Sequence, residues 1–149
     1  MLTLHTAPLL RTAPGGPPSE AAAVAVRADR IVAVGPLVQL SQEYAGARVR
    51  RWPGTLGPGR VHDAPLPPAP TPRERIHALL RLGVTAVLAE HVSDPMLRTA
   101  VDRSDLLVLE DASVPPTLAP GGRADLAVLA DDGTCLVTVL AGRLVHRRA

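Results

Sequence analysis

Aromatic side chains are almost absent from this chain of 149 residues, which has no Phe, one Trp (Trp52) and one Tyr (Tyr44). Burial must rest on aliphatic side chains, and each buried Val or Leu contributes about 1.5–3 kcal/mol, so a domain of this length can still be stable. Proteins that bind single-stranded nucleic acid combine a basic groove with several stacking rings. Since the net charge is also only +2, we expect no nucleic-acid partner.

Lysine is missing altogether, because all sixteen basic residues are Arg. Schiff-base, general-base and carbamylated lysine chemistry are therefore unavailable. Selection for bidentate contacts with anions would favour Arg, but Arg together with abundant Ala, Pro and Gly also suggests a GC-rich coding bias. The Arg residues are spread along the chain, which favours the bias.

Cysteine and long apolar runs are scarce as well. Cys135 is the single cysteine, so no internal disulfide can form, and it falls in a predicted strand where a buried structural role is expected. Residues 1–5 lack the features of a signal peptide, and no apolar run approaches about 18 residues. We expect a cytoplasmic protein that has no membrane segment.

Both ends of the chain predict short strands separated by turns. Residues 22–27 and 30–34 flank Ala28-Asp29 and predict a hairpin, and a short helix is expected after Leu37. Near the C-terminus, Asp131-Asp132-Gly133 and Ala141-Gly142 are good hairpin turns. The further strands predicted are residues 2–10, 47–52, 124–129, 135–140 and 143–146.

The middle of the chain changes character. Residues 53–72 are rich in Pro and Gly and predict a surface connection, which is neither a helix nor a central strand. A capping box at 71–74 then opens a helix that ends at Gly83. The following segments predict a buried strand over 84–89, a helix from Asp94-Pro95 to about Val101 and a second buried strand over 105–109, with the strands parallel.

Three segments resemble parts of the amidohydrolase superfamily, in order along the chain. Val26–Pro36 is similar to the N-terminal hairpin of cyclic amidohydrolases, and Gly121–Leu129 and Val139–Val145 are similar to their C-terminal strands. Pro58-Gly59 stands where members of this family enter the catalytic barrel. Among those members, the segments resemble imidazolonepropionase and aminodeoxyfutalosine deaminase.

The resemblance implies an α+β fold with a composite β-sandwich, formed by N- and C-terminal strands. We assign residues 1–57 and 118–149 to the sandwich, 58–71 to a Pro-rich linker and 72–117 to a small α/β insert of helix, strand, helix and strand. A full (β/α)₈ barrel takes about 250 residues. The insert is therefore interpreted as a remnant of a barrel whose larger part is missing.

The family normally carries a His-x-His pair that binds the catalytic metal. Alignment on Pro58-Gly59 places Ala64 and Leu66 at those two positions. Only His62 and Asp63 are left as weak candidate metal ligands, so no cofactor is expected.

Two polar pairs follow the buried strands of the middle segment. Glu90-His91 comes after the first strand and Glu110-Asp111 after the second. If the strands are parallel neighbours, the four side chains share one edge of the sheet, where α/β proteins commonly place functional residues. They are candidates for binding or acid–base catalysis, and the alternative is that they only end the strands.

Three functions are compatible with the sequence. The first is a non-catalytic amidohydrolase-like domain that binds a protein partner, a second copy of itself or a small ligand. The second is a hydrolase acting on non-peptide C–N bonds, with zinc or iron, whose site another subunit completes. The third is a decaying relic that keeps only residual fold stability.

Overall fold

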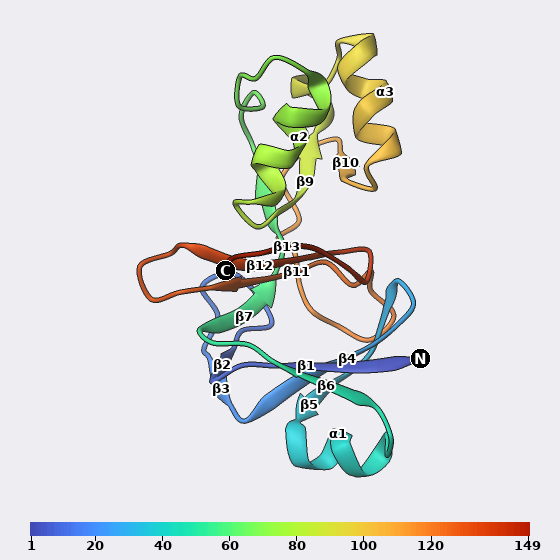
Figure 1. The fold of residues 1–149 in the computed structure, drawn as a ribbon, viewed down its shortest axis with the longest axis vertical. Helices are drawn as coiled ribbons and strands as arrows, with labels where there is room; N and C mark the ends of the chain where they lie inside the picture. The colour runs from blue at the N-terminus through green and yellow to red at the C-terminus, as the bar shows by residue number, and fades with distance from the viewer.

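The computed structural model describes all residues, 1–149, as an α+β protein in which no sheet closes into a barrel. Figure 1 shows three tiers: a helical tier with a small sheet, a central sheet and a second sheet that carries a short helix. This is the fold class predicted from the sequence. None of its helices has the length and apolar character needed to cross a membrane.

One sheet of the sandwich comes entirely from the N-terminal third. Its strand order is β5-β4-β1-β6, with the hairpin β4–β5 antiparallel and β6 parallel to β1. The helix α1 follows β5 directly and buries Leu40 against this sheet. The elements are β1 (Leu2–Thr6), β4 (Ala22–Arg27), β5 (Arg30–Pro36), α1 (Leu37–Glu43) and β6 (Arg48–Arg51).

The second sheet of the sandwich joins the two ends of the chain. Its strand order is β13-β12-β11-β7-β2-β3, and the junction is the antiparallel pair β7–β11, in which Leu56 lies opposite Val128. The composite sandwich predicted from the sequence is therefore present. Its strands are β2 (Leu9–Leu10), β3 (Ser19–Glu20), β7 (Thr55–Pro58), β11 (Leu126–Leu129), β12 (Cys135–Leu140) and β13 (Arg143–Arg147).

The third tier is a layer of parallel strands and helices, called the α/β layer below. Its sheet has the order β10-β9-β8 with all strands parallel, so β8 and β10 each have one free edge. The helices α2 and α3 bury Leu79 and Val101 against Val87 of the central strand. The elements are β8 (Arg60–His62), α2 (Pro72–Leu80), β9 (Val84–Leu88), the 3₁₀ turn η1 (Ala89–His91), α3 (Pro95–Arg103) and β10 (Leu107–Leu109).

Local signals account for the ends of both long helices. Thr71 Oγ1 accepts a hydrogen bond from the Glu74 backbone N–H at 3.2 Å, and Asp94 Oδ2 accepts one from that of Leu97 at 3.0 Å. Each cap is followed by Pro at the first helical position, which needs no N–H partner. Gly83 has a φ of +83° just before β9, a conformation that a side chain would strain.

The α/β layer and the sandwich share side chains at their boundary. Leu140 of β12 lies in the same buried cluster as the residues of α2 and α3. Thr138 Oγ1 donates a hydrogen bond of 2.6 Å to the carbonyl oxygen of Leu80, at the end of α2. These contacts fix the position of the α/β layer on the central sheet.

The structure differs from the predicted elements in two places. The predicted strand 2–10 is divided into β1 and β2, which belong to different sheets, with Pro8 between them. The range 53–72, predicted as a surface connection that holds no central strand, contains β7, which lies between β11 and β2, so that prediction is wrong. Its part 58–71, predicted as a linker, contains the edge strand β8. The nearest prolines, Pro58 and Pro65, lie outside β8, so its pairing with β9 loses no hydrogen-bond donor. The domain boundaries stay predictions.

Candidate functional site

The carboxyl ends of the parallel strands in the α/β layer meet at one edge and carry polar residues. Asp63 directly follows β8, Glu90 and His91 belong to η1 after β9, and Glu110 directly follows β10. This arrangement follows from the parallel pairing, because the strands run in one direction and end on the same side. We call this edge the carboxyl-end rim.

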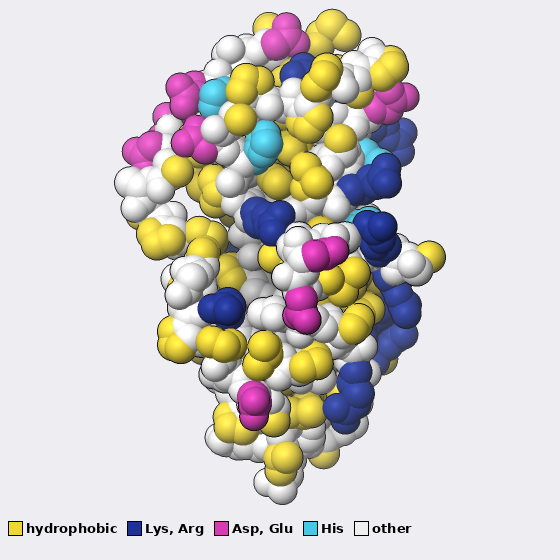
Figure 2. Space-filling view, turned by 90° about the vertical axis from the view of Figure 1, so that its left-hand side faces the viewer, with side chains coloured by type: hydrophobic (Ala, Val, Ile, Leu, Met, Phe, Trp, Pro, Cys, Tyr) yellow, Lys and Arg dark blue, Asp and Glu magenta, His cyan; other side chains and the backbone are white.

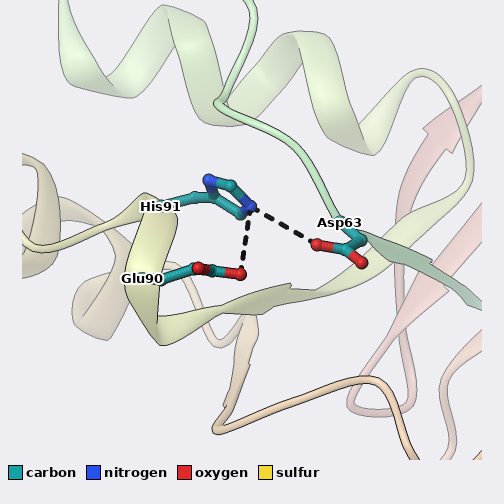
Figure 3. Close-up of side chains that lie close together, drawn as sticks. All are labelled: Asp63, Glu90 and His91. Atoms are coloured by element: carbon teal, nitrogen blue, oxygen red, sulfur yellow. Dashed lines mark hydrogen bonds and ion pairs between the residues drawn. The ribbon is translucent and has the colours of Figure 1, made fainter.

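Three side chains of the rim converge in space (Figure 3). The His91 Nε2 atom lies 3.4 Å from Asp63 Oδ1 and 3.6 Å from Glu90 Oε1, and the two carboxylates reach it from different elements. The His91 side chain is 20% exposed, whereas those of Asp63 and Glu90 are more than half exposed. A partly sheltered imidazole therefore lies between two solvated carboxylates.

The chemistry of this trio suits a cation. One imidazole nitrogen and two carboxylate oxygens lie within 4.8 Å of one another, and these are donor types that zinc accepts at about 2.0–2.2 Å. Exposed acidic groups also lie close together without an ion. The two carboxylates make the trio an acidic spot at the carboxyl-end rim.

The two positions predicted for the family's metal-binding pair, Ala64 and Leu66, carry no side-chain metal ligand. Leu66, at the second position of that pair, is buried in the core of the α/β layer, and Ala64 has no donor. His62 Nε2 lies 3.2 Å from the carbonyl oxygen of Pro65, so this side chain turns to its own loop. Of the predicted metal candidates, only Asp63 reaches the trio.

The second predicted pair, Glu110-Asp111, lies apart from the trio. The strands β9 and β10 are parallel neighbours as predicted, but Glu110 and Asp111 line a cleft of about 350 Å³ instead of contacting Glu90 or His91. Asp111 Oδ1 accepts a hydrogen bond of 2.9 Å from the Ser113 backbone N–H. Its hydrogen bonds with Ser113 hold the pKa of this carboxyl below its usual value.

This cleft, called the sheet cleft below, lies on the face of the β8-β9-β10 sheet away from the helices. Val61, Thr85 and Leu107, one from each strand, line it, and no residue of α2 or α3 does. At Gly59 the backbone packs directly against the Thr85 side chain, so a Cβ at that position would clash. Sequence reasoning missed the strand residues of the cleft. Alternation would place Thr85 on the face of Val87, which packs against the helices, but the register shift between β8 and β9 interrupts the alternation at Thr85.

Arg123 and Asp125 close one side of the sheet cleft. Asp125 Oδ1 accepts hydrogen bonds from Arg123 Nε at 3.1 Å and from the Ala141 backbone N–H at 2.9 Å. Burial raises the pKa of Asp125, and the bonds from Ala141 and Arg123 oppose that rise. Through the bond from Ala141, Asp125 anchors the turn between β12 and β13.

The most strongly perturbed histidine lies far from the rim, inside the sandwich. The Trp52 Nε1–H donates a hydrogen bond of 3.2 Å to His5 Nδ1, and the two rings stack with an interplanar angle of 12°. Burial, with a smaller contribution from the positive charge of Arg50, lowers the pKa of His5 from 6.5 to about 4. His5 therefore belongs to the core.

Comparison with known proteins gives likenesses in structure only. No family model and no curated protein matches the sequence. Among solved structures, Helicobacter pylori aminofutalosine deaminase is similar with a TM-score of 0.55 and 17% identity over 72% of this chain. Escherichia coli guanine deaminase gives 0.57, 16% and 72%, and a zinc-bound adenosine deaminase from Xanthomonas campestris gives 0.58, 20% and 88%.

The fold resembles the corresponding part of these deaminases. The resemblance predicted from the hairpin and C-terminal segments is thereby confirmed. At these identities the likeness concerns the fold alone. The matched part spans only 32%, 35% and 37% of the three deaminase chains, about a third of their length.

Proposed function

We propose that this chain acts as a non-catalytic amidohydrolase-like domain that binds a small ligand in the sheet cleft. The proposal rests on the residues at the two positions predicted for the family's metal-binding pair. Leu66 is buried among core side chains at one position of that pair, and Ala64 has no donor at the other. A hydrolase of this family needs a metal to activate water, and a buried Leu cannot bind one.

The lining of the sheet cleft supports a particular ligand chemistry. Leu107, Leu109 and Val114 supply an apolar wall. Glu110 and Asp111 add carboxylates that have no cationic partner, whereas Arg123 is paired with Asp125. A ligand with an apolar body and one cationic group, such as an amine or an amidine, complements this combination.

Calorimetric titration with benzamidine and with benzoate tests the ligand. We expect saturable binding of benzamidine, no binding of benzoate and a loss of about tenfold in benzamidine affinity for Glu110→Gln. Glu20→Gln, a change of an exposed Glu in the sandwich strand β3, is the matched control and should bind as the parent does. Equal binding of both probes, or an equal loss in both variants, contradicts the proposal.

The trio of Asp63, Glu90 and His91 favours a second candidate, a hydrolase acting on non-peptide C–N bonds. Its three donors would hold zinc or iron, which would supply an activated water. The free edges of β8 and β10 would accept strands from a second copy or from another protein, which would complete the site. In this candidate the oligomer is the active species.

Metal analysis combined with native mass measurement separates the two candidates. The first predicts protein without stoichiometric zinc or iron and no release of ammonia from guanine or adenosine, the substrates named by two of the similar deaminases. Zinc-dependent ammonia release by an oligomer would establish the second. Failure of the chain to fold when expressed alone would favour a decaying relic over both.

A further inference from the structure

A second cleft, of about 610 Å³, lies between α2, α3 and β13. Its polar lining comes from all three elements: Arg73 and His77 on α2, Arg103 on α3 and Arg143 on β13. We call it the Arg cleft. None of the residues that line it belongs to the trio at the carboxyl-end rim, so the two sites share no side chain.

The charges that line the Arg cleft are of one sign. Three guanidinium groups border it, and no Asp or Glu does, although the chain has 14 acidic residues. Arg73 and Arg103 form neither an ion pair nor a side-chain hydrogen bond. Arg143 Nη2 is 2.9 Å from Asp105 Oδ2, which occupies only one of its five donors. Most of the guanidinium N–H groups are therefore free.

Two other Arg residues on the same helices already have partners, unlike Arg73 and Arg103. On α3, Arg98 Nε lies 2.9 Å from Asp102 Oδ1, and on α2, Arg75 donates to the carbonyl oxygens of Leu66 and Pro67. Figure 2 shows dark blue side chains gathered in a column along one flank of the molecule, while most Asp and Glu side chains of the upper layer lie on the other. An anion in the cleft would relieve the repulsion among its like charges.

The floor of the Arg cleft is apolar. Ile76 and Leu80 of α2, Ala100 of α3 and Val145 of β13 form it, and Ser104 Oγ donates its hydrogen bond to the Val101 carbonyl oxygen, so its hydroxyl proton is already engaged. Burial of these side chains by a ligand would be favourable. The cavity volume also lies within the range of about 300–1,000 Å³ that is typical of small-molecule sites.

We propose that the Arg cleft binds a small organic anion, consisting of a carboxylate or phosphate attached to a short apolar group. The fork of N–H donors on Arg matches the paired oxygens of both anions, and the floor accepts the apolar group. This site is independent of the sheet cleft, whose free charges are negative, and of any metal at the carboxyl-end rim.

Calorimetric titration of the full chain with phenyl phosphate tests the proposal, with inorganic phosphate and benzyl alcohol as partial probes. We expect saturable binding of phenyl phosphate at one site, roughly tenfold weaker binding of inorganic phosphate and none of benzyl alcohol. A parallel titration with phenylacetate distinguishes a carboxylate preference from a phosphate preference. Added salt should weaken the binding, since the site is exposed.

Arg73→Gln and Arg103→Gln should each weaken the binding of the preferred anion by about tenfold. Arg98→Gln is the matched control, because Arg98 lies on α3 but does not line the cleft, and it should leave the affinity unchanged. Thermal unfolding confirms that all three variants fold. An equal loss in Arg98→Gln, binding of benzyl alcohol, or binding of anionic vesicles or nucleic acid without binding of either small anion would overturn the proposal.

Discussion

The buried polar side chains His5 and Thr6 of the sandwich are paired, whereas the charged side chains that line the clefts of the α/β layer are largely exposed. In the sandwich, Thr6 Oγ1 donates to the Ala22 carbonyl oxygen at 2.6 Å, and His5 accepts from Trp52. In the α/β layer, Glu90 and Glu110 lie at the surface, and neither side chain forms a hydrogen bond. Yet no buried side-chain polar atom lacks a partner in either region.

The difference indicates a division of roles. Buried polar groups that are fully paired hold one arrangement of the sandwich strands, and they are not available to a ligand. Exposed carboxylates and guanidinium groups contribute little to stability, so changes to them should alter ligand binding more than folding. The comparison predicts that changes in the core alter stability and that changes at the clefts alter binding.

The largest effect is expected for Leu79→Ala, in the core beneath α2. Leu79 is fully buried in a cluster that includes Leu140 of the sandwich, so the cavity should cost about 2–5 kcal/mol of unfolding free energy. Denaturation followed by Trp52 fluorescence and by helical circular dichroism measures it. The exposed Leu82→Ala serves as the control, and two separate transitions would show that the regions unfold independently.

Acid should destabilise the sandwich through His5. Its pKa falls from 6.5 to about 4 on folding, so the unfolded state binds the proton more tightly, and stability is full above pH 6.5 and lost as the pH falls to about 4. At about 1.36 kcal/mol for each unit of pKa, the loss approaches roughly 3 kcal/mol. Urea denaturation across this pH range measures it.

The variant His5→Asn checks the assignment of this pH dependence. Its amide oxygen can still accept the hydrogen bond of Trp52 but cannot titrate. The slope of stability against pH between 4 and 6.5 should therefore become shallower. An unchanged slope would assign the effect to other groups.

A smaller loss, on the order of 1–3 kcal/mol, is expected for Asp125→Ala. The change leaves Arg123 Nε and the Ala141 N–H without their acceptor at the boundary between the regions. Asp125→Asn keeps one carbonyl oxygen and should lose less. Chemical denaturation measures both variants, and an equal loss in the two would mean that the charge, rather than the acceptor, is what matters.

The smallest effect on stability is expected at the carboxyl-end rim. His91→Ala should change the unfolding free energy by no more than about 0.5 kcal/mol, because its neighbours Asp63 and Glu90 are exposed. Thermal unfolding measures it, with His77→Ala on the exposed side of α2 as the comparison. A loss as large as that of Leu79→Ala would place His91 in the core and remove the contrast between the regions.

Most local elements could be predicted from the sequence, because their signals are local. Thr71 and Asp94 cap the helices that their patterns predict, and Ala28-Asp29 turns the predicted hairpin. The strand β8 was missed because three residues between prolines carry no periodicity. The segment is a strand only because it pairs with β9.

The candidate site was predictable in part. The positions of Glu90 and His91 after a buried strand pointed to the rim, but their convergence with Asp63 depends on the pairing of β8 with β9. That pairing joins residues more than twenty positions apart, for which the chain has no local signal. The sequence pattern also could not predict that Glu110 lies apart from the trio.

The sequence by itself determined the helix caps, the turns, the aliphatic core and the absence of lysine chemistry, since each depends on residue type and near neighbours. The tertiary structure decided which distant segments meet. It paired β7 with β11 and gathered Arg73, Arg103 and Arg143, which lie spread along the chain, around one cleft. The physical reason is that burial of a shared apolar core selects long-range contacts, and exposed charges are carried to wherever that packing places them.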